Sequence, residues 1–149
     1  MKNEAIVRAV RESPSAPAPQ HVDVTHVAGQ AYAVYIRDHE LTVDQPILAG
    51  GDDDGPTPVE LFVSSLATCV AYYAGRYLQR HHLPCDNLRV RAEFEMAEDR
   101  PTRVAAVRMR VLLPLRLSET RQRALRAVVH HCTVHNSLRQ PPEVTVQLD

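Results

Sequence analysis

Fifteen consecutive residues without a charge, Leu61–Gly75 (LFVSSLATCVAYYAG), constrain the fold more than any other feature of the chain. A helix needs about 20 apolar residues to span a bilayer, so this run is too short to cross a membrane. Helix signals flank it. Pro58 stands where a first turn tolerates proline, Arg80 suits the negative end of a helix dipole, and Pro84 ends the pattern. A helix uncharged on every side belongs at the centre of a core. We therefore expect a central helix of about 24 residues beginning near Pro58.

Alternation of apolar and polar residues predicts strands on both sides of this helix. We expect them at residues 21–28, 31–36, 39–44, 88–96, 103–113 and 143–148. A second helix fits between the last two segments, because Ser118 is a suitable N-cap and apolar residues recur at helical spacing as far as Cys132. This order of elements predicts an α+β fold with antiparallel sheet and a long central helix.

Length and charge limit the possible functions. A chain of 149 residues fits one domain. Residues 1–20 include the proline-rich SPSAPAP and are expected to form an extended arm, with residues 21–149 as a single domain. A net charge of −1 argues against a dedicated nucleic-acid binder. Residues 1–60 are acidic (4 basic, 10 acidic) and 61–149 basic (13 basic, 8 acidic), so the two parts either attract, within one chain or across a dimer, or are simply solvated.

The cellular compartment is expected to be the cytoplasm. The start of the chain, MKNEAIVRAVRESP, lacks the apolar segment of a secretory signal. Three cysteines, an odd number, indicate a reducing environment and not a disulfide scaffold. We expect neither a membrane nor a nucleic acid as a partner.

Two of the cysteines occupy positions where a thiol would be chemically useful. Cys69 lies inside the uncharged run, and Cys132 follows the amphipathic stretch SETRQRALRAVVHH. A cysteine in a buried helix is usually a small hydrophobic residue, whereas two such cysteines can form a redox pair. The residues alone leave both interpretations open. The third cysteine, Cys85, follows Pro84 in a connecting segment, and no role is assigned to it.

Two segments, GGDDDGPTPVELFVSSLATC (50–69) and CTVHNSLRQPPEV (132–144), resemble the OsmC/Ohr family of osmotically inducible and organic hydroperoxide resistance proteins. With the order of elements, the resemblance extends over residues 31–149. It implies an intertwined homodimer of α+β subunits with active sites at the interface. It also implies a thiol peroxidase in which an organic hydroperoxide attacks at Cys69, Cys132 resolves the product, and an external dithiol restores both thiols. No metal or organic cofactor is implied.

The family also has an arginine beside the reactive cysteine, held by a glutamate at the start of the central helix. Arg37 in IRDHELTVD best matches this arginine, although a charged turn residue is the plain alternative. The family's acid stands ten residues before the cysteine, where this chain has Val59. Glu60 is offset by one, so it either serves as the acidic partner near an irregular helix start or only occupies the positive helix end. Thr133 replaces a proline that often follows the second cysteine. The chain therefore resembles a divergent OsmC-like branch.

Two further functions compete with the peroxidase. The group His130, His131, Cys132 and His135 suggests zinc, but adjacent helical residues point about 100° apart, and the aspartates 52–54 lack the alternation of a calcium loop. We therefore expect no metal site. The stronger competitor is a non-catalytic or weakly catalytic dimer that binds an apolar small molecule in its interface pocket. Val59 favours that hypothesis, and the cysteine pair favours the enzyme.

Overall fold

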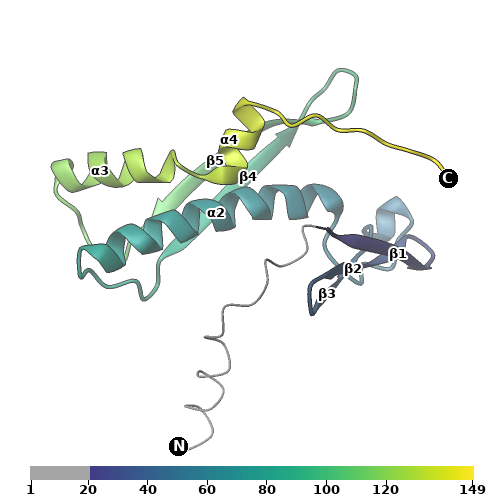
Figure 1. Cartoon of the computed structure of the whole chain (residues 1–149), viewed down its shortest axis with the longest axis horizontal. Coiled ribbons are helices and arrows are strands. Elements are labelled where there is room, and N and C mark those ends of the chain that lie inside the picture. The colour runs from purple at the N-terminus through teal and green to yellow at the C-terminus, as the bar shows by residue number, and fades with distance from the viewer. Residues whose placement is uncertain (1–20) are drawn as a thin grey trace, which may run out of the picture. The chain divides into compact units, whose positions relative to one another are not determined.

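The computed structural model describes residues 21–149, so the expected arm at residues 1–20 lies outside the described residues. The described chain falls into two compact units, which divide between Thr57 and Pro58. The first contains a small sheet, and the second contains a helical layer on a hairpin (Figure 1). The antiparallel strands of both units and the helices of the second make the fold α+β, and the predicted fold class is confirmed.

The first unit is a three-stranded antiparallel sheet in the order β1-β2-β3. Its strands are β1 (Asp23–Ala28), β2 (Ala31–Ile36) and β3 (His39–Val43), which confirms three of the predicted strands. Gly29 supplies the left-handed backbone of the first turn, with φ of 52°. Arg37 occupies the second turn with φ of 54°.

The glycine-rich loop after β3 is folded around one buried carboxylate. Asp44 is 1% exposed and accepts backbone N–H groups from Gln45 at 2.7 Å, Asp52 at 3.0 Å and Asp54 at 3.1 Å. These bonds, chiefly the one from Asp54, hold the pKa of the Asp44 carboxyl below its ordinary value. A Cβ atom at Gly51 would collide with the Gln45 carbonyl. The glycines and aspartates of this loop therefore serve the loop's own conformation.

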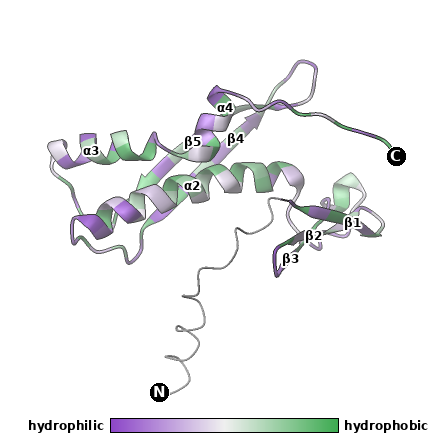
Figure 2. Ribbon diagram, in the orientation of Figure 1, coloured by the Kyte–Doolittle hydropathy of each residue, from purple (hydrophilic) through white to green (hydrophobic). Residues whose placement is uncertain are grey.

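The second unit packs helices against a two-stranded sheet. Helix α2 (Pro58–Arg80) contacts the antiparallel pair β4 (Arg89–Met96) and β5 (Val104–Leu112). Helices α3 (Glu119–Val129) and α4 (Thr133–Arg139) follow and also pack on α2. Figure 2 shows hydrophobic residues along much of α2. The predicted central helix is therefore confirmed, beginning at Pro58.

The core of this unit lies where α2 meets α3. Ala74 and Leu78 of α2 are fully buried and cluster with Tyr77, Leu117 and Leu125. Ala74 has the smallest side chain of this group, which lets the two helices approach closely. Burial of these apolar side chains, each contributing about 1.5–3 kcal/mol when large and fully buried, stabilises the α2–α3 pair.

Two sequence predictions fail at the C-terminal end of the chain. The segment 143–148 forms no strand in the described structure, and Val144, Val146 and Leu148 are 80%, 83% and 95% exposed, not inward-facing. A period-two pattern specifies a strand only where a neighbouring strand supplies hydrogen-bond partners. The second helix also ends at Val129, three residues before Cys132, and a separate short helix then begins. The predicted N-cap of α3 is correct, because the Ser118 hydroxyl accepts the Arg121 N–H.

Candidate active site

The two cysteines singled out in the sequence meet where α2 packs on α4. Cys69 is half-buried in the middle of α2, and Cys132 is fully buried immediately before α4. Both are free thiols, and their side chains lie close enough for Cys69 to shift the pKa of Cys132. The fold therefore brings together two thiols that are 63 residues apart in the sequence.

Cys132 is the N-cap of α4, and its surroundings favour the protonated thiol. Its Sγ accepts the backbone N–H of His135 at 3.4 Å. Burial, followed by the hydrogen bond with Cys69, raises the pKa of Cys132 above its ordinary value, while the N–H groups of His135 and Val134 oppose this shift. The raised pKa makes Cys132 less suited than an unperturbed thiol to react as a thiolate.

A second contact ties the surroundings of the two cysteines together. The hydroxyl of Tyr73, one turn after Cys69, lies 3.5 Å from Oγ1 of Thr133, which follows Cys132. The Tyr73 ring also packs edge-on against Tyr72, with centroids 5.4 Å apart. The sequence marks Thr133 only as a departure from the family pattern. The contact between Thr133 and Tyr73 could not be predicted from the sequence, which shows only that Tyr73 follows Cys69 by four residues.

A cavity of about 300 Å³, lined mostly by hydrophobic residues, lies between α2, β5 and α4, and neither cysteine is among its lining residues. Phe62 and Leu66 line it from the face of α2 that carries Cys69, and Met109 lines it from β5. Helix α4 contributes His135 and Leu138. The backbone N–H of His135 donates to the capping Cys132 Sγ, and His135 also lines this cavity. Such a cavity can accept the hydrocarbon part of a small organic molecule.

The structure places the two charged candidates on different units. Helix α2 is regular from Pro58, and Glu60, nine residues before Cys69, lies in its first turn on the opposite side of the helix. Arg37 lies exposed in the β2–β3 turn of the first unit. The roles of both residues at the thiol remain predictions.

Arg76 is a cation of α2 that the sequence analysis did not single out. It follows Cys69 by seven residues and so lies on the same face of α2, about 10.5 Å along the helix axis. Its Nη1 donates to the Tyr72 hydroxyl at 3.2 Å, and its guanidinium lies 5.7 Å from the centre of that ring. The spacing of seven residues between Cys69 and Arg76 could have identified Arg76 as a cation on the same face of the helix as Cys69.

Within residues 21–149, no three His, Cys, Asp or Glu side chains are grouped as metal ligands would be. The imidazoles of His130 and His135 lie with their centres 6.3 Å apart. Over the same residues, no helix is both long enough and apolar enough to cross a membrane. The candidate site therefore consists of two neighbouring thiols, Cys69 half-buried and Cys132 fully buried.

Comparison with known proteins identifies the family. Residues 51–147 match the family model described as OsmC-like protein, and the chain belongs to this family. This confirms the resemblance drawn from the two cysteine segments. A comparison with curated proteins gave no match.

Solved structures show the same fold. An osmotic stress and detoxification response protein from Psychrobacter arcticus 273-4 superposes with a TM-score of 0.72 at 20% identity, over 85% of this chain and 90% of that one. An OsmC-like protein from Mycoplasma pneumoniae gives 0.67 at 15% identity, over 85% and 91%. An organic hydroperoxide resistance protein from Elizabethkingia anophelis gives 0.62 at 18% identity, over 87% and 95%. At such identities these likenesses establish the fold.

Proposed function

We propose that the protein is a thiol-dependent peroxidase that reduces organic hydroperoxides and contributes to defence against oxidative stress. The observation that carries the proposal is the close approach of the Cys69 side chain to the buried Cys132 thiol. Membership of the OsmC family supports it, because similar folds occur in proteins named for organic hydroperoxide resistance.

The reaction begins at Cys69. Its thiolate attacks one oxygen of the peroxide, the O–O bond breaks, and the alkoxide leaves with a proton as an alcohol. Cys69 is thereby oxidised by two electrons to a sulfenic acid. The Cys132 thiol then attacks that sulfur, a disulfide forms, and water leaves. An external dithiol reduces the disulfide by exchange and becomes a disulfide itself, which returns both protein thiols.

Arg37 and Glu60 complete the proposed site. A thiolate in an apolar environment is destabilised by desolvation, so it requires a nearby positive charge. Arg37 supplies this positive charge in the proposal, and Glu60 orients the Arg37 guanidinium. Glu60 is the weaker assignment, because it is offset by one residue from the usual acid position and lies opposite Cys69 on α2.

The apolar cavity supports an organic substrate. Phe62, Leu66 and Leu138 offer hydrocarbon contacts within a volume of about 300 Å³. Apolar contact is worth about 25 cal/mol per Å² buried, which an alkyl hydroperoxide gains and hydrogen peroxide does not. The proposed selectivity is therefore for bulky organic hydroperoxides.

The proposed assembly is an intertwined homodimer in the cytoplasm. The C-terminal segment with Val144, Val146 and Leu148 is strand-like in sequence but exposed in the single chain, and a second subunit would provide it with a partner. Light scattering should give twice the mass of 16.7 kDa at micromolar concentration. A monomeric mass would contradict this assembly.

The competing function is binding of an apolar small molecule without efficient redox turnover. The cavity between α2, β5 and α4 supports it, and Val59 at the family's acid position weakens the case for an efficient enzyme. The two functions make different demands on the thiols, because binding in the cavity does not require oxidation of Cys69.

The decisive experiment follows consumption of cumene hydroperoxide by the wild type, Cys69→Ser and Cys132→Ser, with dithiothreitol as reductant. We expect Cys69→Ser to be inactive. In a separate reaction without dithiothreitol, Cys132→Ser should react once and accumulate a sulfenic acid that dimedone traps at Cys69, detected by mass spectrometry. Cys85→Ser is the matched control and should behave as the wild type. Equal, slow consumption by the wild type and Cys69→Ser would favour the binding protein.

A further inference from the structure

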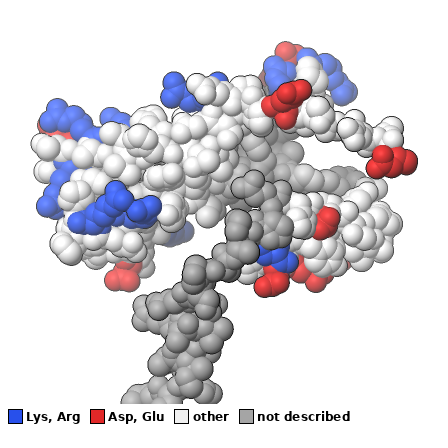
Figure 3. All heavy atoms as spheres, in the orientation of Figure 1, with Lys and Arg blue, Asp and Glu red and all other residues white. Residues whose placement is uncertain are grey.

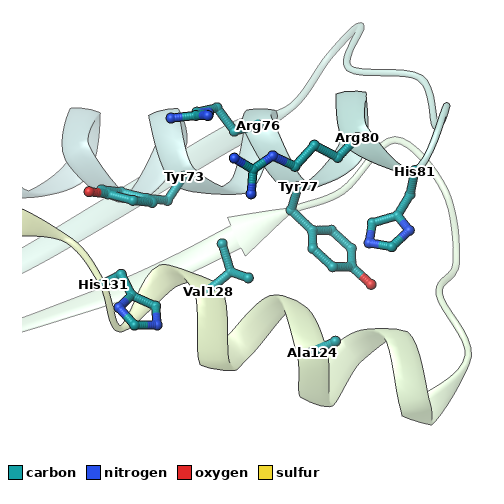
Figure 4. Close-up of a pocket in the computed structure, with 8 residues that line it drawn as sticks. All are labelled: Tyr73, Arg76, Tyr77, Arg80, His81, Ala124, Val128 and His131. Atoms are coloured by element: carbon teal, nitrogen blue, oxygen red, sulfur yellow. The ribbon is translucent and has the colours of Figure 1, made fainter.

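A second cavity, of about 490 Å³, lies between the C-terminal half of α2 and α3. Its rim carries four basic side chains: Arg76 and Arg80 from α2, His81 just after it, and His131 just after α3. Figure 4 shows His81 and His131 toward opposite ends of the groove. No acidic side chain lines this cavity. The thiol chemistry does not use it.

The floor of the groove is apolar and fixed in place. Ala124 and Val128 of α3 face the rings of Tyr73 and Tyr77 from α2 (Figure 4). Tyr77 is only 5% exposed, and its hydroxyl donates to the Arg121 carbonyl at 3.3 Å. A pocket with an apolar floor and a few convergent polar groups is typical of small-molecule sites, which span about 300–1,000 Å³.

The two arginines differ in their availability. Arg76 is already engaged by the hydroxyl and ring of Tyr72. Arg80 is exposed, and among residues 21–149 no hydrogen bond or ion pair engages its guanidinium. It extends back along α2 over the groove in Figure 4. A planar guanidinium without a partner is suited to bidentate binding of a carboxylate or phosphate.

The surroundings strengthen the attraction for anions. Helix α3 adds three exposed arginines, Arg121, Arg123 and Arg126, against the single acid Glu119. Figure 3 shows basic side chains gathered over this end of the second unit. Clustered charge of one sign raises the local concentration of oppositely charged ligands.

We propose that this groove binds a small organic oxyanion, a carboxylate or a phosphate monoester carried on a compact apolar body. Arg80 holds the oxyanion, His81 and His131 flank it, and the apolar body lies against Val128 and the tyrosine rings. The proposal is independent of the peroxidase, since it uses neither cysteine.

Binding to the full-length protein is measured by calorimetry with three probes that share one ring system: 2-naphthoate, 2-naphthyl phosphate and 2-naphthylmethanol. We expect at least one of the two anions to bind and the neutral alcohol to bind about tenfold more weakly or not at all, because it offers no charge to Arg80. The stronger of the two anions identifies the head group.

Matched variants place the site. Arg80→Gln should weaken anion binding by about tenfold, the loss of one charge-assisted contact. Arg123→Gln removes the same charge from the neighbouring helix outside the groove and should change it by less than about twofold. Cys69→Ser should bind as the wild type, so the result does not depend on the peroxidase. Equal binding of the alcohol, equal effects of the two arginine variants, or no binding by folded wild type would each overturn the proposal.

Discussion

The thiol of Cys132 is fully buried beside Cys69, and its Sγ also caps α4 by accepting the His135 N–H at 3.4 Å. One side chain thus has two tasks. It begins a helix, and it places a protonated sulfur against the cysteine proposed to react. Because the cap and the thiol pair share an atom, chemistry at Cys132 is coupled to the conformation of α4.

This coupling predicts a loss of stability in alkaline solution. The pKa of Cys132 is raised by burial, so the folded state holds the proton more tightly than the unfolded state, whose value is near 9.0. The contribution to stability is complete below pH 9.0 and is lost as the pH rises through the folded value. Urea unfolding under reducing conditions at pH 7.5 and pH 10 measures it. Cys132→Val should lose less stability over this interval than the wild type, with Cys85→Val as control.

Replacement of Arg37 by alanine should slow oxidation of Cys69 by cumene hydroperoxide by about tenfold at pH 7, the effect of losing roughly 1.4 kcal/mol of thiolate stabilisation. Stopped-flow kinetics measure the rate, which should recover as rising pH restores the thiolate. Arg91→Ala, on the exposed side of β4, is the control. A rate unchanged from the wild type would reduce Arg37 to an ordinary turn residue.

Glu60→Gln should have a smaller effect on the same rate, about threefold or less, because Glu60 lies on the side of α2 opposite Cys69. Circular dichroism should show intact helices, which separates a local effect from misfolding. If this variant proves as damaging as Arg37→Ala, Glu60 orients the guanidinium in spite of its offset, and our interpretation of the helix start is wrong.

Asp44→Asn should destabilise the loop that precedes α2 and lower the melting temperature at pH 7. The pKa of Asp44 is lowered chiefly by the Asp54 N–H, so the contribution to stability is present above the ordinary value of 3.8 and is lost as the pH falls through the folded value. The difference from the wild type should therefore shrink below pH 3.8 in thermal melts. Asp53→Asn, at an exposed neighbour, should melt as the wild type at both pH values.

Much of the local structure follows from the sequence. The uncharged run with Pro58 before it predicted the central helix. The alternation of apolar and polar residues predicted five strands to within two residues at either end. Local signals suffice there because helix and hairpin hydrogen bonds join residues close in sequence. The two cysteine segments also indicated the family.

Short-range rules did not reveal α4 or its cap. Cysteine is not among the preferred N-cap residues, so nothing in CTVHNSLR separates a new helix from the end of the preceding one. The expected strand at 143–148 failed for a related reason. Its pattern is correct, but a strand exists only with a partner, and the described chain offers it none.

The sequence by itself determined the central helix, five of the strands, the family and the pair of cysteines worth testing. Only the tertiary structure decided that Cys132 is buried and protonated against Cys69, that Tyr73 reaches Thr133, and that Arg80 overlies an apolar groove. Hydrophobic periodicity predicts which side of a helix is buried. It does not predict which side chain, distant in the sequence, packs against that side, because this depends on how α2, α3 and α4 pack together.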